Sequence, residues 1–158
     1  MKKTLLMVAI LAMASVATVM AQPRAIGGRI GYGLEVSYQH GLGDNMLTIE
    51  AGVPGFYSGQ AVVTYDWINP FNTSIPWDEK GSWNWSLGVG GAVGGSWVGN
   101  YGYIGAVGRV NVEYSFWFPL QLAVDFRPML GVGFGKDYVG FAWDAYAGGI
   151  GISARYLF

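Results

Sequence analysis

Apolar and polar residues alternate with a period of two through most of the chain after residue 22. Between residues 104 and 116 the even positions are mostly apolar or aromatic, whereas the odd positions include Arg109, Asn111 and Glu113. The same alternation recurs over residues 120–134 and again before the last residue, and helical spacing is not found. A β-strand turns successive side chains to opposite faces of its sheet, so the pattern predicts strands with one apolar face.

We expect eight antiparallel strands. The first two depend on a three-residue turn at Gly31–Gly33, which would pair Ile30 with Leu34, whereas a single long strand over residues 26–38 would leave seven. An even number brings both chain ends to the same side of a closed sheet. The expected strands are residues 23–30, 34–41, 46–54, 60–68, 83–94, 101–116, 120–134 and 145–158.

The apolar face of these strands meets either a soluble interior or lipid. In a soluble sandwich or lipocalin-like barrel it points inward, and in a membrane barrel it points outward. The polar face is small and rich in glycine, which suits a narrow lumen, and aromatic residues stand near strand ends as membrane interfaces require. The sequence therefore predicts an all-β fold, a closed antiparallel eight-stranded transmembrane β-barrel. The aromatic residues are Tyr38, Tyr65, Trp67, Trp83, Trp85, Tyr114 and Tyr156.

Residues 1–21 have the organisation of a secretory signal peptide. Lys2 and Lys3 precede an apolar run, and Val19-Met20-Ala21 offers small residues at a cleavage position. An N-terminal membrane anchor is the alternative, although the run is short for a helix that crosses a bilayer. We expect export of the chain, with residues 22–158 forming the barrel domain.

Composition removes several classes of function. The chain of 158 residues has 26 glycines, 12% charged residues, no cysteine and a net charge of −1. Without cysteine there is no disulfide, thiolate nucleophile or cysteine metal site. Without a basic surface a nucleic-acid partner is not expected, and no motif indicates a cofactor.

Charged residues gather on the face expected to line the lumen. Arginines and carboxylates in a narrow interior are costly unless paired, so a mutual salt-bridge network that fills the lumen is expected. A charge-lined channel for solutes is the alternative. The expected network comprises Arg29, Glu35, Glu50, Asp66, Arg109, Glu113, Asp125, Arg127 and Arg155.

Catalytic and metal sites have weaker support. His40 lies near Ser37 and Glu35 in the sequence, which suggests a site like that of a lipid A deacylase, but alternation puts His40 on the opposite face from the other two. Acidic residues also occur in expected loops, without the spacing of a calcium loop, and we interpret them as solvated charge. These are Asp78, Glu79, Asp137 and Asp144.

The first hairpin and the connections at residues 55–59, 95–100 and 135–144 are expected to face outward, and those at 42–45, 69–82 and 117–119 to face the periplasm. Two outward connections are rich in aromatic residues, at Phe56-Tyr57 and over residues 138–143. Aromatic residues there anchor the barrel at the membrane interface or recognise a partner or glycan.

Several short motifs resemble those of the small outer-membrane β-barrel proteins of Bacteroidota, in the broad class of OmpA-like barrels. They are residues 26–31, 36–40, the hairpin around Phe116 and Leu120, residues 125–128 and residues 152–158. The resemblance implies residence among outer-membrane lipids and insertion by the outer-membrane assembly machinery. It also implies that this machinery recognises the last strand through Tyr156 and Phe158.

Together these observations predict a non-enzymatic barrel of the cell envelope, with a structural or interaction role. An outer-leaflet lipid-modifying enzyme and a small solute pore are the alternatives.

Overall fold

The computed structural model describes residues 23–71, 80–137, 139–144 and 149–158. The expected signal peptide, residues 1–21, lies outside these ranges. In the described ranges, no helix is long and apolar enough to cross a membrane. The strands are β1 Pro23–Ile30, β2 Gly33–Leu42, β3 Asn45–Pro54, β4 Ser58–Pro70, β5 Gly81–Ser96, β6 Tyr101–Phe116, β7 Leu120–Phe126, β8 Met129–Phe134, β9 Val139–Asp144 and β10 Ile150–Leu157.

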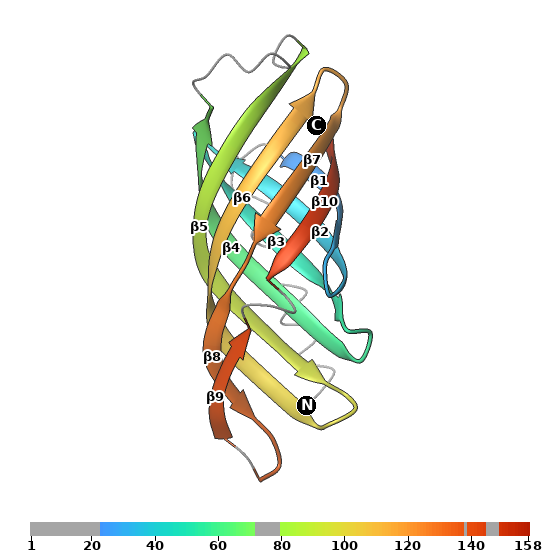
Figure 1. Cartoon of the computed structure of the whole chain (residues 1–158), viewed down its shortest axis with the longest axis vertical. Coiled ribbons are helices and arrows are strands. Elements are labelled where there is room, and N and C mark those ends of the chain that lie inside the picture. Colours follow the sequence, from blue (N-terminus) through green and yellow to red (C-terminus); the bar gives the residue numbers. More distant parts are fainter. Residues whose placement is uncertain (1–22, 72–79, 138, 145–148) are drawn as a thin grey trace.

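The strands close into an antiparallel barrel with an eight-stranded ring (Figure 1). Strands β1 to β7 pair in succession, β7 pairs with β10, and β10 pairs with β1. Strands β8 and β9 form a hairpin beyond this ring, where β8 pairs with the first half of β6. The expected all-β, closed eight-stranded architecture is confirmed.

The first hairpin resolves the alternative left open by the sequence. Strands β1 and β2 are separated by Gly31 and Tyr32, and Ile30 pairs with Leu34 as expected. The backbone N–H of Gly31 donates to the carbonyl of Gly33 at 3.1 Å. Two strands therefore form, because this short turn allows both to bury the same polar face.

The strand expected at residues 120–134 is interrupted at Arg127 and Pro128. Proline has no backbone N–H to give to a sheet, so a break or bulge is favoured there. The freed groups find other partners: the Arg127 N–H donates to the Gly149 carbonyl at 2.6 Å, and the Gly108 N–H to the Pro128 carbonyl at 3.1 Å. Because of this interruption, the first half of β6 pairs with β8 and its second half pairs with β7.

The expectation of a loop over residues 135–144 was wrong for its second half, which forms β9. Glycine and aromatic residues masked a short alternation, in which Ala142 is buried while Phe141 and Trp143 are exposed. Pairing with β8 satisfies its backbone. The strand expected at residues 145–158 is confirmed only as β10, since residues 145–148 lie outside the described part of the chain.

The interior is polar and the exterior apolar. Arg155, Gln121 and Glu113 are among the largest fully buried side chains, whereas Ile30 and Ile104 are 63% and 59% exposed. A small apolar cluster of Val62, Ala92 and Val107 lies inside toward one end. This arrangement inverts that of a soluble protein.

The turns at residues 31–32, 55–57 and 97–100 and the β8–β9 hairpin lie at one end of the barrel, the lower end in Figure 1. We call this end the mouth. Strands β5, β6, β8 and β9 reach further toward it than β1 and β2 do. The turns at residues 43–44 and 117–119 lie at the opposite end.

Candidate functional site

Glu50 on β3 is the centre of the charge network inside the barrel. Its carboxylate accepts from Arg109 at 3.2 Å and from Arg155 at 3.4 Å, and it forms an ion pair with Arg127. The hydroxyl of Ser37 also donates to it, at 2.9 Å. These side chains come from β2, β3, β6, β10 and the break after β7, and meet because each occupies the polar face of its strand.

A second group of ion pairs extends the network toward the mouth. Arg29 contacts Glu35 at 2.9 Å and Asp125 at 2.7 Å. Arg127 reaches Glu35 at 2.8 Å, and Arg109 reaches Asp125 at 3.4 Å. Because Arg109 and Arg127 also contact Glu50, the two groups form one continuous network across the lumen.

Glu113 pairs with Arg24, which the sequence analysis did not include. The Arg24 guanidinium also donates to Gln39 at 2.8 Å. Arg24 stands at an even position of β1, where strict alternation predicts the outer face, but the pairing of β1 with β2 shifts register between Pro23 and Ala25. A β-bulge changes which face a side chain occupies, and the preceding proline was the only signal in the sequence.

Asp66 is buried with the others but is held differently. The hydroxyls of Thr48 and Thr64 donate to its Oδ2 atom at 2.6 and 3.0 Å. Among the described residues no salt bridge connects it to an arginine. It stands opposite Gly88 of β5, where a Cβ atom would collide with its carboxylate. Hydroxyl donors therefore replace a guanidinium at this position.

The structure thus buries every residue of the expected lumen network, and all of them except Asp66 form ion pairs, Glu113 with Arg24 and the others with one another. The free space between Arg29, Glu35 and Arg127 is about 10 Å³. That is room for about one water molecule. Side chains can fill an eight-stranded barrel completely, and this arrangement favours a plug over a channel.

The three residues considered for hydrolysis are not brought together. The Ser37 hydroxyl donates to Glu50 and accepts from Arg155 at 2.9 Å inside the barrel. His40 Nδ1 instead lies 2.9 Å from the Tyr38 hydroxyl, a neighbour on the other face of β2. A triad requires nucleophile and base within hydrogen-bond reach.

In the part of the chain that the structure describes, no group of three acidic or histidine side chains could hold a metal ion. Asp137 is exposed in the turn between β8 and β9. Asp78 and Glu79 lie outside the described residues, and so does the side chain of Asp144.

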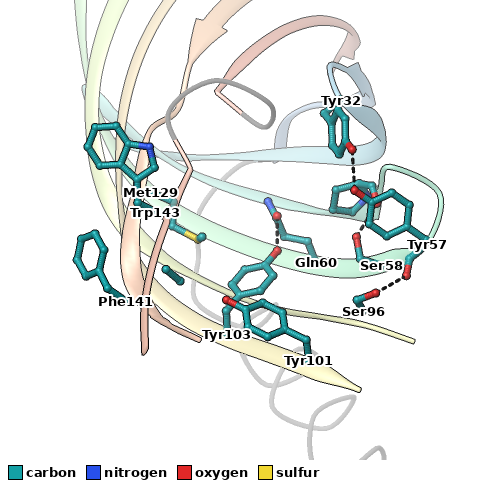
Figure 2. Close-up of a pocket in the computed structure, with 12 residues that line it drawn as sticks. Tyr32, Tyr57, Ser58, Gln60, Ser96, Tyr101, Tyr103, Met129, Phe141 and Trp143 are labelled. Atoms are coloured by element: carbon teal, nitrogen blue, oxygen red, sulfur yellow. Dashed lines mark hydrogen bonds between the residues drawn. The ribbon is translucent and has the colours of Figure 1, made fainter. Parts of the chain in front are cut away.

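The mouth contains a cavity of about 320 Å³ (Figure 2). Four tyrosines contribute to its wall. The hydroxyls of Tyr32 and Tyr57 are 2.6 Å apart, and the Tyr103 hydroxyl donates to Gln60 Oε1 at 2.5 Å. The lining consists of Tyr32, Pro54, Tyr57, Ser58, Gln60, Ser96, Tyr101, Tyr103, Met129, Phe141, Ala142 and Trp143.

Glycines on the neighbouring strands make room for two of these rings. A Cβ atom at Gly94 would collide with the Tyr103 ring, and one at Gly133 would collide with the Tyr101 ring. Both tyrosines stand at odd positions of β6, the face that carries Arg109 further along the strand. The glycines therefore let two bulky rings lie across the inside of the barrel wall.

The aromatic residues expected in outward connections divide between two environments. Tyr57 lines the cavity, whereas Phe56 is 67% exposed. Phe141 and Trp143 also line the cavity, but they are 65% and 59% exposed. They pair with Val132 and Leu130, which are exposed on the outer face of β8. Tyr138 lies outside the described residues.

Aromatic residues also gather at the end opposite the mouth. Tyr114 contacts Trp83 and Phe116 with ring centroids 4.8 and 4.7 Å apart. The expected assembly signal lies in the last strand, where Tyr156 and Phe158 are exposed and their rings meet edge to face at 5.5 Å.

Comparison of the chain with protein-family models, with curated proteins and with solved structures finds no match. The resemblance to small outer-membrane barrels of Bacteroidota therefore stays a prediction from the sequence.

Proposed function

We propose that this protein is an integral outer-membrane β-barrel with a lumen filled by ion pairs, and that it has a structural or interaction role in the cell envelope without catalysis. The observation that carries the proposal is the inverted distribution of polarity. Charged side chains are buried inside the ring, while large apolar side chains on its strands are exposed outside.

An apolar exterior of this kind requires lipid around it. Leu34 and Val36 on β2 and Ile152 on β10 are each at least half exposed, on the two strands that flank β1, as parts of an apolar surface too extensive for a soluble monomer. Hydrocarbon offers no hydrogen bonds, so a spanning sheet must close on itself. The eight-stranded ring meets that condition.

Two further observations support the outer membrane in particular. The aromatic cluster around Tyr114 and the exposed Tyr156 and Phe158 stand at one end of the barrel, as interfacial girdles do. The signal peptide expected at residues 1–21 would deliver the chain across the inner membrane. Outer-membrane lipid and the outer-membrane assembly machinery are accordingly its proposed partners.

No specific observation favours either of the alternative functions. A solute pore needs a passage, and the network around Glu50 occupies the lumen. A lipid-modifying site built on Ser37 and His40 needs the two side chains on one face, and they occupy opposite faces of β2.

The first test is fractionation combined with heat modifiability. The processed protein should appear in the outer-membrane fraction, and unboiled and boiled samples should migrate differently on one denaturing gel, because a closed barrel resists detergent until heated. Recovery in the soluble periplasmic fraction without a mobility shift would contradict the proposal. The apolar face would then belong to a lipocalin-like carrier.

A further inference from the structure

We infer that the mouth is a binding site for a small, neutral, hydroxyl-bearing ring compound, which makes a saccharide its ligand class. The inference rests on the proposed function for the direction that the mouth faces, which is away from the cell. The cavity itself follows from the barrel alone.

The size of the cavity suits a small molecule. Its volume of about 320 Å³ lies at the lower end of the range for ligand pockets, roughly 300–1,000 Å³. Its wall is built from the turns after β1 and β3, from the end of β3 and from β4, β5, β6, β8 and β9 (Figure 2). Sheet residues hold most of this wall, so the cavity is formed before a ligand arrives.

The tyrosine rings provide flat apolar surfaces with polar edges. Tyr101 and Tyr103 lie with ring centroids 6.4 Å apart and planes tilted by 38°. Tyr32 and Tyr57 face them across the cavity and contact each other edge to face. A sugar ring has apolar C–H faces that pack on aromatic rings, and hydroxyls that tyrosine edges can meet.

Uncharged hydrogen-bonding groups complete the lining. Gln60 has both a carbonyl and an amide group, and Ser58 and Ser96 have hydroxyls. Gln60 Oε1 accepts from Tyr103 at 2.5 Å, and its Nε2 donates to Glu35 at 3.4 Å. These two contacts hold Gln60 between the cavity wall and the ion-pair network. Its side chain is therefore already ordered, which lowers the entropy lost when a ligand binds.

The charges near the cavity disfavour ionic ligands. None of the described side chains that line the cavity is charged, and the small adjoining space is bordered by two arginines and one carboxylate, Arg29, Arg127 and Glu35. Without a carboxylate in the described lining, the cavity offers a cation only the faces of its tyrosine rings, the groups that bind quaternary ammonium ions in aromatic cages. Both guanidinium groups already contact carboxylates, which leaves little attraction for an anion.

The test is calorimetric titration of the purified, detergent-solubilised barrel with three neutral disaccharides (maltose, cellobiose and lactose) and with choline and inorganic phosphate. We expect saturable binding of at least one disaccharide and none of either ion. Tyr101→Ala and Gln60→Leu should each weaken that binding at least tenfold. Tyr65→Ala, which removes the same side chain near the opposite end, should leave it unchanged.

Each variant is first checked for the heat-dependent mobility shift, and Gln60→Leu keeps the test decisive if Tyr101→Ala does not fold. Absence of saturable disaccharide binding, binding of choline or phosphate instead, or unchanged binding in both mouth variants would overturn the inference. Fractionation separates the two proposals. A periplasmic protein that binds a disaccharide would overturn only the location, and an outer-membrane barrel that binds none would overturn only the saccharide site.

Discussion

Charged side chains inside this barrel are stabilised mainly by one another. Glu50 contacts the guanidinium groups of Arg109, Arg127 and Arg155, and these groups are almost completely buried, so water cannot compensate for their loss of hydration. Removing one partner of a buried pair leaves an uncompensated charge, which costs more than the pair itself contributes. The position of a carboxylate in the network therefore decides how much its removal costs.

Glu50→Gln should destabilise the barrel by about 3–5 kcal/mol, because three buried arginines lose their shared anion. Glu113→Gln is the matched control and should be milder, since its partner Arg24 is 21% exposed and can turn toward water. Urea unfolding in lipid vesicles, followed by tryptophan fluorescence, measures both. Equal losses would show that Glu50 is not the centre of the network.

Gly151→Ala should destabilise by about 1–3 kcal/mol through overpacking. The side chain of Arg29 lies against Gly151, where a Cβ atom would collide with the guanidinium and displace it from Asp125. Gly28→Ala on the adjacent strand is the control, because its nearest neighbour would be a carbonyl oxygen 3.8 Å away. The same unfolding assay should show little change for the control. A Gly151→Ala barrel as stable as the original would place Arg29 elsewhere.

At the scale of strands, the barrel is longer on one side than on the other. Strands β5 and β6 have 16 residues each, whereas β1 has 8. About 9–11 residues suffice to cross a bilayer, so the proposed orientation raises the ends of β5 and β6, with the β8–β9 hairpin, above the lipid. The described pairings leave one edge of β9 open, which suits water better than hydrocarbon.

The outer face of β7 tests the proposed surroundings. Val124 is 54% exposed and pairs with Val112 on β6 and Ile152 on β10. In lipid, Val124→Arg should cost about 2–4 kcal/mol and reduce insertion, because a charge would face hydrocarbon. A charge at Val112 should do the same. Val124→Leu is the control.

Insertion is scored by the heat-dependent mobility shift in the membrane fraction. If the Val124→Arg variant inserts as well as the Glu113→Gln variant, the two faces of the strands do not differ in their surroundings. The proposed topology would then be wrong.

At the scale of the whole molecule, the filled lumen predicts no steady conductance. The buried ion pairs around Glu50 extend across the lumen, and the space beside Arg29, Glu35 and Arg127 is about 10 Å³, room for about one water molecule. Planar bilayers containing the purified protein should show no unitary current steps, and a general porin added afterwards should show them. Reproducible steps from this protein alone would favour the solute-pore alternative.

Local alternation along the chain was enough to predict most of the strands, their polar face and the first hairpin. A strand alternates its side chains with a period of two, so Arg109, Asn111 and Glu113 had to share a face wherever the strand lay. The same local rule placed the expected charges together. It also made Ile30 and Leu34 partners across Gly31–Gly33, because pairing at a short turn depends only on adjacent residues.

Which strands meet, and where the alternation fails, depends on how the whole sheet pairs and closes. The bulge that turns Arg24 inward depends on how β1 pairs with β2, and Pro128 divides the partners of β6 between β7 and β8. The tyrosines of the mouth come together across four strand pairings, from β2, which follows Tyr32, to β6, which carries Tyr103. Closure of a sheet is non-local, so periodicity along the chain fixes which face a residue occupies but not which residues it will face across the lumen.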